Sequence, residues 1–151
     1  MDRVGGKVAV SYGSPVKATS QFGGAFSSGG IVFDGVDDYF EVTATNNPIA
    51  GKKKVTIVAL FKATSGATGS DEWKCWRYPG PINAESPGTP KDFGLTIGAD
   101  GLARAFLSDA IPMSSSVSVI DGQAHTMILT WSDTDVGDST ARFYVDGAPS
   151  T

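Results

Sequence analysis

Apolar and polar residues alternate with a period of two along many short segments of the chain, which is the pattern of half-buried β-strands. No window places apolar residues at i, i+3, i+4 and i+7 over three helical turns without an interrupting Gly, Pro or Ser-rich stretch, so no helix is predicted. The expected strands are Lys7–Tyr12, Val16–Gln21, Gly30–Asp34, Asp38–Thr43, Val55–Ala63, Trp73–Tyr78, Phe93–Gly98, Leu102–Ser108, Val117–Ile120, His125–Ser132 and Ala141–Asp146. Short, evenly spaced strands with turn residues between them predict an all-β sandwich, jelly roll or barrel.

Between the strands, Asp-Gly pairs mark tight turns. Gly35, Gly101 and Gly147 each follow an aspartate, and glycine reaches the positive φ of a tight reversal without steric cost. Along Val55–Phe61 both faces of the expected strand are apolar, which predicts a central strand. The segment 79–90 contains four prolines, which have no N–H to donate to a sheet, so an exposed loop is expected there.

Length and charge exclude several classes of protein. The 151 residues are typical of one domain with its own core, so we expect a single soluble domain over 1–151. With 12 Lys+Arg against 16 Asp+Glu the formal charge is −4, and no basic stripe exists to bind nucleic acid. No apolar run is long enough for membrane insertion, no secretory signal opens the chain, and Cys75 is the only cysteine, so no intramolecular disulfide can form.

Four blocks occur in the order found in one known family. They are Gly29–Val42, Val55–Lys62, Asp121–Trp131 and Phe143–Gly147, the last two corresponding to the family's "DGQWHH…TW" strand and "YVDG" turn. In these blocks the chain resembles laminin G-like domains of the concanavalin A-like lectin/glucanase superfamily. The resemblance implies an antiparallel β-sandwich of the concanavalin A-like, pentraxin-like jelly-roll type.

The sequence also departs from that family. Leu60, Ala124 and Thr126 stand where the family usually has Trp, Trp and His. Relatives continue through further strands after the "YVDG" turn, so the resemblance implies that C-terminal strands are lacking, are supplied by a partner, or are not needed. An open edge near Lys7–Tyr12 and Val16–Gln21 would then favour a homodimer by strand addition or exchange.

Catalytic residues are not expected. Glycosidases of this superfamily need two paired carboxylates, but the three glutamates, Glu41, Glu72 and Glu85, lie in different segments without acidic partners. No Gly-x-Ser-x-Gly elbow is present, and the only histidine, His125, is interpreted as a structural residue with satisfied hydrogen bonds. We therefore predict that the protein is not an enzyme, with a glucanase-type glycoside hydrolase as a less favoured alternative.

Two aspartate clusters are candidates for Ca²⁺, the one cofactor considered. Asp133, Asp135 and Asp138 offer three carboxylates within one short loop, although a solvated hairpin loop is the favoured interpretation. Asp34, Asp37 and Asp38 form the second cluster. For these residues we expect a corner in which carboxylates accept hydrogen bonds from backbone N–H groups.

Aromatic residues supply the candidate ligand site. Trp73, Trp76, Arg77 and Tyr78 lie beside the proline-rich segment, and aromatic faces flanked by hydrogen-bonding groups suit sugar rings. Strand alternation predicts that Trp73 points inward while Trp76 and Tyr78 point outward. Packing within an ordinary strand explains the same residues equally well.

These observations favour a non-catalytic, lectin-like binding module for carbohydrate binding or adhesion. By resemblance it would belong to a larger secreted, cell-surface or virion protein and would bind a glycan or a surface protein. The alternative is a structural or assembly module of a virion or surface layer. Fold resemblance alone does not identify a ligand.

Overall fold

The computed structural model describes residues 8–18, 29–66, 80–84, 92–107, 113–133 and 139–150. The chain divides into two compact units, Met1–Lys52 and Lys53–Thr151, and each is described by itself. The single domain expected over 1–151 stays a prediction. Within the described ranges, no helix has the length and apolar character needed to cross a membrane.

The first unit contains two small antiparallel sheets and a short 3₁₀ helix, Ala44–Asn46. In one sheet β1 (Val10–Tyr12) pairs with β4 (Tyr39–Glu41), and in the other β2 (Val16–Ala18) pairs with β3 (Gly30–Val32). Each of the first two strands is therefore paired along one edge within this unit. A homodimer through the remaining edges stays a prediction.

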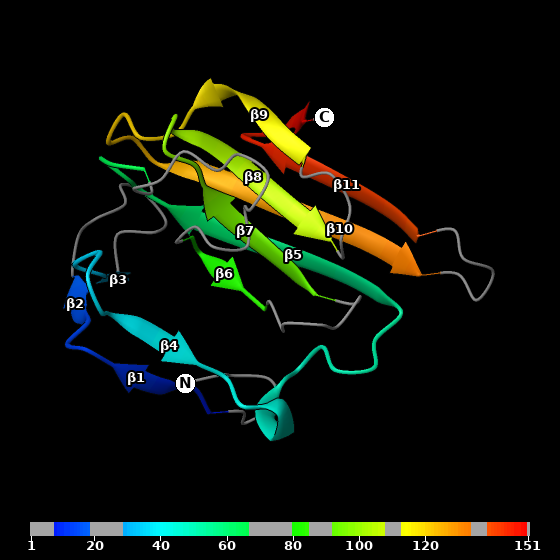
Figure 1. Ribbon diagram of the computed structural model, residues 1–151, viewed down its shortest axis with the longest axis horizontal. Coiled ribbons are helices and arrows are strands. Elements are labelled where there is room, and N and C mark those ends of the chain that lie inside the picture. The colour runs from blue at the N-terminus through cyan, green and yellow to red at the C-terminus, as the bar shows by residue number, and fades with distance from the viewer. Residues whose placement is uncertain are drawn as a thin grey trace. The chain divides into compact units, whose positions relative to one another are not determined.

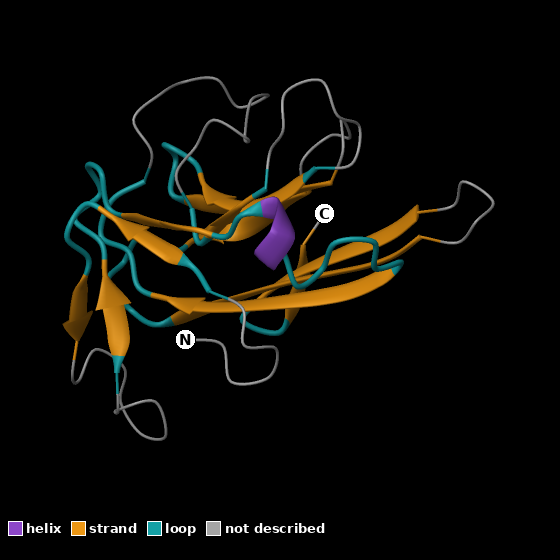
Figure 2. Ribbon diagram, turned by 90° about the horizontal axis from the view of Figure 1, so that it is seen from below, coloured by secondary structure: helices purple, strands orange, loops and turns teal. Residues whose placement is uncertain are grey.

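The second unit is an antiparallel β-sandwich, as the sequence predicts. One sheet has the order β12-β11-β10-β5, from β5 (Lys54–Phe61), β10 (His125–Asp133), β11 (Ser139–Val145) and β12 (Ala148–Ser150). The other has the order β6-β7-β8-β9, from β6 (Ile82–Asn83), β7 (Phe93–Ile97), β8 (Leu102–Leu107) and β9 (Met113–Ser118). The strands β7 and β8 cross over β5 and β10 in Figure 1, and Figure 2 shows the sheets as two layers.

Alternate residues of β10 and β11 form one side of the core, and all five residues of β7 are buried. In β10, Met127 and Leu129 are fully buried, and their partners in β11, Val145 and Phe143, are almost fully buried. Phe93 of β7 and Trp131 of β10 bridge the layers, with ring centroids 5.0 Å apart. Burying such side chains stabilises the fold by roughly 1.5–3 kcal/mol each, before chain entropy is counted.

Strand β5 has the predicted faces but not the predicted position. Val55 lies on the inner face and is buried, whereas Val58 on the opposite face is 63% exposed. Among the described strands β5 pairs with β10 alone and ends the sheet, so the prediction of a central strand is wrong. The apolar residues on its outer face suggested burial on both sides, but the structure leaves Val58 open.

Three further differences concern strand boundaries. Strand β9 begins at Met113, four residues before the expected start, because Met113 and Ser114 pair with Ala105 and Arg104 of β8. At the register shift that follows, the hydroxyl of buried Ser115 bonds to the backbone. This oxygen accepts a 3.0 Å hydrogen bond from the N–H of Ala103 and donates a 2.7 Å bond to the carbonyl of Val117. Strand β6 lies within the segment expected to be a loop, and β12 follows Gly147 without having been predicted.

The Asp-Gly turns are confirmed. Gly35, Gly101 and Gly147 have φ values of 76°, 79° and 80°, in the left-handed region where a side chain would be strained. These turns connect β3 to β4, β7 to β8 and β11 to β12. The last two join strands that pair with each other, whereas β3 and β4 belong to different sheets.

Candidate functional site

Most of the side chains singled out from the sequence lie outside the described residues. These are Trp73, Trp76, Arg77 and Tyr78 of the aromatic group and Asp135 and Asp138 of the acidic loop. Asp133 is the last residue of β10 and pairs with Ser139 of β11, so a hairpin encloses this loop as expected. The glycan and calcium sites on these residues stay predictions.

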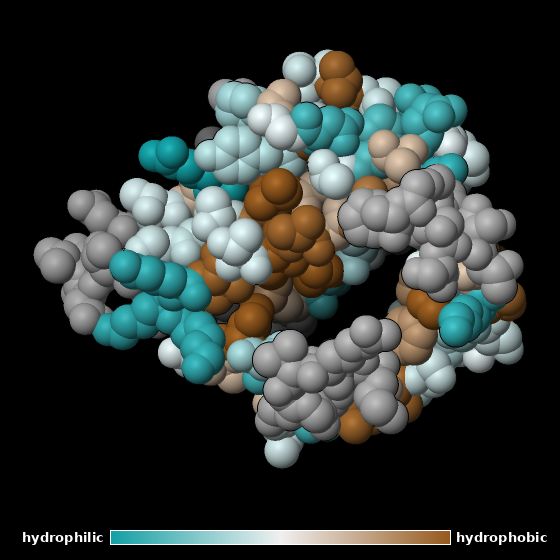
Figure 3. Space-filling view, turned by 180° about the vertical axis from the view of Figure 1, so that it is seen from behind, coloured by the Kyte–Doolittle hydropathy of each residue, from teal (hydrophilic) through white to brown (hydrophobic). Residues whose placement is uncertain are grey.

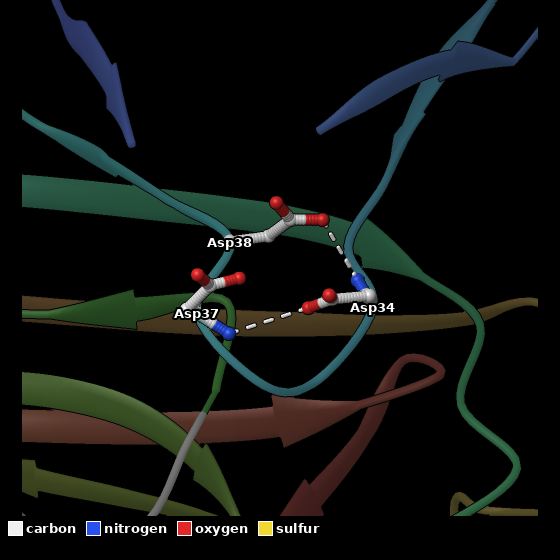
Figure 4. A group of neighbouring side chains, drawn as sticks. All are labelled: Asp34, Asp37 and Asp38. Atoms are coloured by element: carbon white, nitrogen blue, oxygen red, sulfur yellow. Dashed lines mark hydrogen bonds between the residues drawn. The ribbon is translucent and has the colours of Figure 1, made fainter. Parts of the chain in front are cut away.

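The aspartate corner of the first unit has the predicted capping bonds (Figure 4). The Oδ1 atom of Asp34 accepts hydrogen bonds from the N–H groups of Val36, at 2.8 Å, and Asp37, at 3.3 Å. Asp38 accepts one from the N–H of Asp34, at 2.9 Å, and a second from the N–H of Ser14. Two of the three carboxylates therefore hold the corner between β3 and β4 and tie it to the turn after β1.

This hydrogen bonding also explains the electrostatics of the corner. The N–H of Val36, assisted by neighbouring backbone N–H groups, lowers the pKa of Asp34. Ligand oxygens from the three aspartates lie within 4.8 Å of one another, beside an open cleft of about 500 Å³. Carboxylates at this spacing can ligate a hard cation. Their backbone bonds are sufficient to explain the positions of Asp34 and Asp38.

His125 is structural, as predicted. It is the first residue of β10 and is 8% exposed. Its Nδ1 lies 2.7 Å from Oδ2 of Asp146, and its Nε2 lies 2.9 Å from Oδ1 of Asp121. Burial alone would lower the pKa of His125, but these two carboxylates outweigh burial and raise it. With both ring nitrogens engaged, neither is free to take a proton from a substrate.

A pair of exposed, stacked tyrosines forms an aromatic surface on the first unit. Tyr12 of β1 and Tyr39 of β4 are cross-strand partners, with ring centroids 4.6 Å apart and ring planes 8° from parallel. The two residues are 40% and 50% exposed. A hydrogen bond to Glu41 on the same face raises the pKa of Tyr12. The surface therefore combines aromatic rings with an exposed carboxylate.

Sequence reasoning missed this pair although it predicted both strands. Tyr12 and Tyr39 lie within the expected strands Lys7–Tyr12 and Asp38–Thr43. What brings the rings together is the register of β1 on β4, which depends on the intervening turns and on the β2–β3 hairpin. The sequence feature that could have indicated this pair is that an aromatic residue lies in each of two expected strands, one before and one after the aspartate corner.

A polar cleft of about 410 Å³ lies on the second unit. Its lining includes Lys54 and Thr56 from β5, Thr130 and Ser132 from β10, and Thr140 and Arg142 from β11. The hydroxyl of Thr56 donates a 3.1 Å hydrogen bond to the hydroxyl of Thr130. These residues alternate with the core positions of their strands, and this alternation was the sequence signal for the cleft.

Comparisons with known proteins give no relative. No protein-family model matches the chain, and no characterised protein or solved structure matches it either.

Proposed function

We propose that the protein is a non-catalytic binding module whose ligand is a glycan. The observation that carries this proposal is the exposed, stacked pair Tyr12 and Tyr39 with Glu41 beside it. Aromatic rings pack against the C–H faces of sugars, and a carboxylate accepts hydrogen bonds from sugar hydroxyls. The engaged ring nitrogens of His125 are consistent with binding without catalysis.

The sequence resemblance supports the same function. Laminin G-like and concanavalin A-like domains are usually binding modules of secreted, cell-surface or virion proteins, and the antiparallel sandwich is compatible with that fold. We also propose that the strands are connected as in a jelly roll and that the protein is extracellular, on a cell surface or part of a virion. The proposal includes sugar contacts from Trp76 and Tyr78, and Ca²⁺ at Asp133, Asp135 and Asp138, which a rise in melting temperature on adding Ca²⁺ would test.

A glycan array identifies a ligand, and variants of the tyrosine pair then test the site. Tyr12→Ala and Tyr39→Ala should each weaken binding about tenfold, the equivalent of one good aromatic contact. The matched control is Phe40→Ala, because Phe40 lies between Tyr39 and Glu41 in β4 and so points to the other face of the hairpin. The proposal fails if no glycan binds, or if Phe40→Ala weakens binding as much as the tyrosine changes.

A structural or assembly module is the second candidate, favoured by exposed apolar residues in the first unit. Large apolar side chains of this unit that are more than 40% exposed are Val8, Val10, Val16, Ile31, Val32, Phe33, Val36, Tyr39, Phe40 and Val42. Such surface often marks protein contacts. Size-exclusion chromatography at several concentrations should then give an oligomer, with an interface above about 1,000 Å². A monomer at the highest concentration would contradict assembly through copies of this chain.

A further inference from the structure

The outward face of the β12-β11-β10-β5 sheet carries two adjacent rows of polar side chains. In one row Thr130 of β10 lies between Thr56 of β5 and Arg142 of β11. In the next row Ser132 has Lys54 and Thr140 as its cross-strand partners. Partners across antiparallel strands point to the same side of a sheet, so all six side chains share one face. They lie on the face opposite the buried residues Val55, Leu129 and Phe143.

The charge of these rows has one sign. Lys54 and Arg142 are exposed cations, and the other four side chains are neutral hydroxyls. The neighbouring row on the same face, Val58, Ile128 and Tyr144, adds no acid. Within the part of the chain that the structure describes, neither cation has an ion pair or a side-chain hydrogen bond. In a protein of formal charge −4, these two rows therefore contain two cations and no carboxylate. The nearest acid along β10 is Asp133, which follows Ser132 and pairs with Ser139.

The spacing of the two cations suits an extended ligand. Strands in a sheet are separated by about 4.8 Å, and residues two apart on one strand by about 6.8 Å, which places the Cα atoms of Lys54 and Arg142 roughly 12 Å apart. The hydroxyls of Thr130 and Ser132 lie between them. Figure 3, which views the molecule from behind Figure 1, on the side of this sheet, shows hydrophilic and hydrophobic surface next to each other.

We propose that Lys54, Arg142 and the hydroxyls between them bind an oligosaccharide that carries oxyanion groups, as carboxylate or sulfate. Lysine and arginine bind oxyanions through charge-assisted hydrogen bonds, and serine and threonine hydroxyls match sugar hydroxyls. This site shares no residue with the tyrosine pair and names an acidic ligand, so the inference extends the proposed function and does not depend on Tyr12 or Tyr39.

Other anionic ligands fit the face less well. Two cations neutralise only about two phosphates, which is little for a nucleic acid, whose binding grows with the number of neutralised charges. An acidic peptide binds tightly when large apolar side chains enter a pocket. The six side chains of the two rows are all charged or hydroxyl-bearing. The two apolar residues that also line the cleft, Val55 and Trp131, are cross-strand partners on the inner face, where Trp131 contacts Phe93.

Calorimetric titration with three oligosaccharides of equal length tests the proposal. The probes are a galacturonic acid oligomer with carboxylates only, a sulfated dextran oligomer with sulfates only, and unmodified dextran. At least one acidic probe should bind about tenfold more tightly than dextran, and the acidic arm that binds identifies the oxyanion. Each titration is repeated with a calcium chelator, because Asp133, Asp135 and Asp138 follow Ser132 in the chain. Binding through the two rows is expected to survive chelation.

Variants connect any binding to the two rows. Lys54→Ala and Arg142→Ala should each weaken acidic-probe binding about tenfold, whereas Lys17→Ala, which removes an exposed cation from β2, should leave it unchanged. Tyr12→Ala should also leave it unchanged, which separates this inference from the proposed function. The inference is overturned if dextran binds as tightly as the acidic probes, if polyglutamate or single-stranded DNA binds more tightly, if chelation abolishes binding, or if Lys17→Ala has the same effect as Lys54→Ala.

Discussion

At the scale of single residues, the best-defined electrostatic group is His125 with its two carboxylates. The imidazole can donate to Asp146 and Asp121 together only when both ring nitrogens carry protons. Burial opposes ionisation of Asp146, but His125 and Thr126 together outweigh burial and lower the pKa of Asp146. The N–H of Gln123 and then His125 lower the pKa of Asp121. The charged form of the trio therefore stabilises the start of β10 and the β11–β12 turn.

The pH dependence of stability follows from these shifts. The raised pKa of His125 gives a contribution that is complete below its unfolded value of about 6.5 and is lost as the pH rises through the folded value. The lowered pKa values of Asp121 and Asp146 give contributions that are complete above about pH 4 and are lost in more acidic solution. The trio thus contributes most between about pH 4 and 6.5.

His125→Gln should remove this contribution. We expect the variant to lose about 1–3 kcal/mol of unfolding free energy at pH 6, where a charge-assisted pair is replaced by neutral hydrogen bonds. The difference from wild type should shrink by pH 9. Urea denaturation across this range measures it, and parallel pH profiles for the two proteins would show that His125 does not carry the charge.

At the scale of elements, variants of β5 can test how much the buried face of a strand contributes to the unfolding free energy of the sandwich. Val55 faces the other sheet and is 9% exposed, whereas Val58 faces away and is 63% exposed. Val55→Ala should cost about 1–3 kcal/mol of unfolding free energy, and Val58→Ala less than about 0.5 kcal/mol. The same chemical change is made in both variants, so only burial differs. Equal costs in denaturant unfolding would mean that another chain covers the outer face of β5.

Element boundaries show what sequence can predict here. Gly35, Gly101 and Gly147 were recognisable because a turn depends on neighbouring residues alone. The two-residue strand β6 was not, because only its pairing with β7 defines it. The end position of β5 in its sheet also depends on residues far along the chain, and its own apolar pattern pointed to the wrong place.

For the candidate sites too, features set by neighbouring residues could be predicted and features set by distant residues could not. The capping role of Asp34 and the structural role of His125 could be predicted, since local turn chemistry and the absence of a catalytic partner indicate them. The pairing of Tyr12 with Tyr39 could not, because cross-strand register is not a local property. The same holds for Lys54 and Arg142, which share a face only through β10.

At the scale of the whole molecule, the two units differ in how they are stabilised. The sandwich of residues 53–151 has a buried core between two sheets, with Leu95, Met127 and Leu129 fully inaccessible. In the unit 1–52, Ala18 is the one buried apolar residue among those described. Small sheets without a buried face are marginal by themselves. Ligand or partner binding at the first unit should therefore stabilise it, by mass action on the folded state.

The central claim is that the stacked tyrosines bind a sugar ring. Saturation-transfer NMR tests it most directly: tyrosine ring protons are saturated and the signal reaching the protons of the array-selected glycan is measured. We predict transfer to the C–H protons of one sugar face, retained in Phe40→Ala and lost in the Tyr12→Ala, Tyr39→Ala double variant. Transfer that persists in the double variant, or that never reaches the sugar C–H protons in wild type, would contradict the claim.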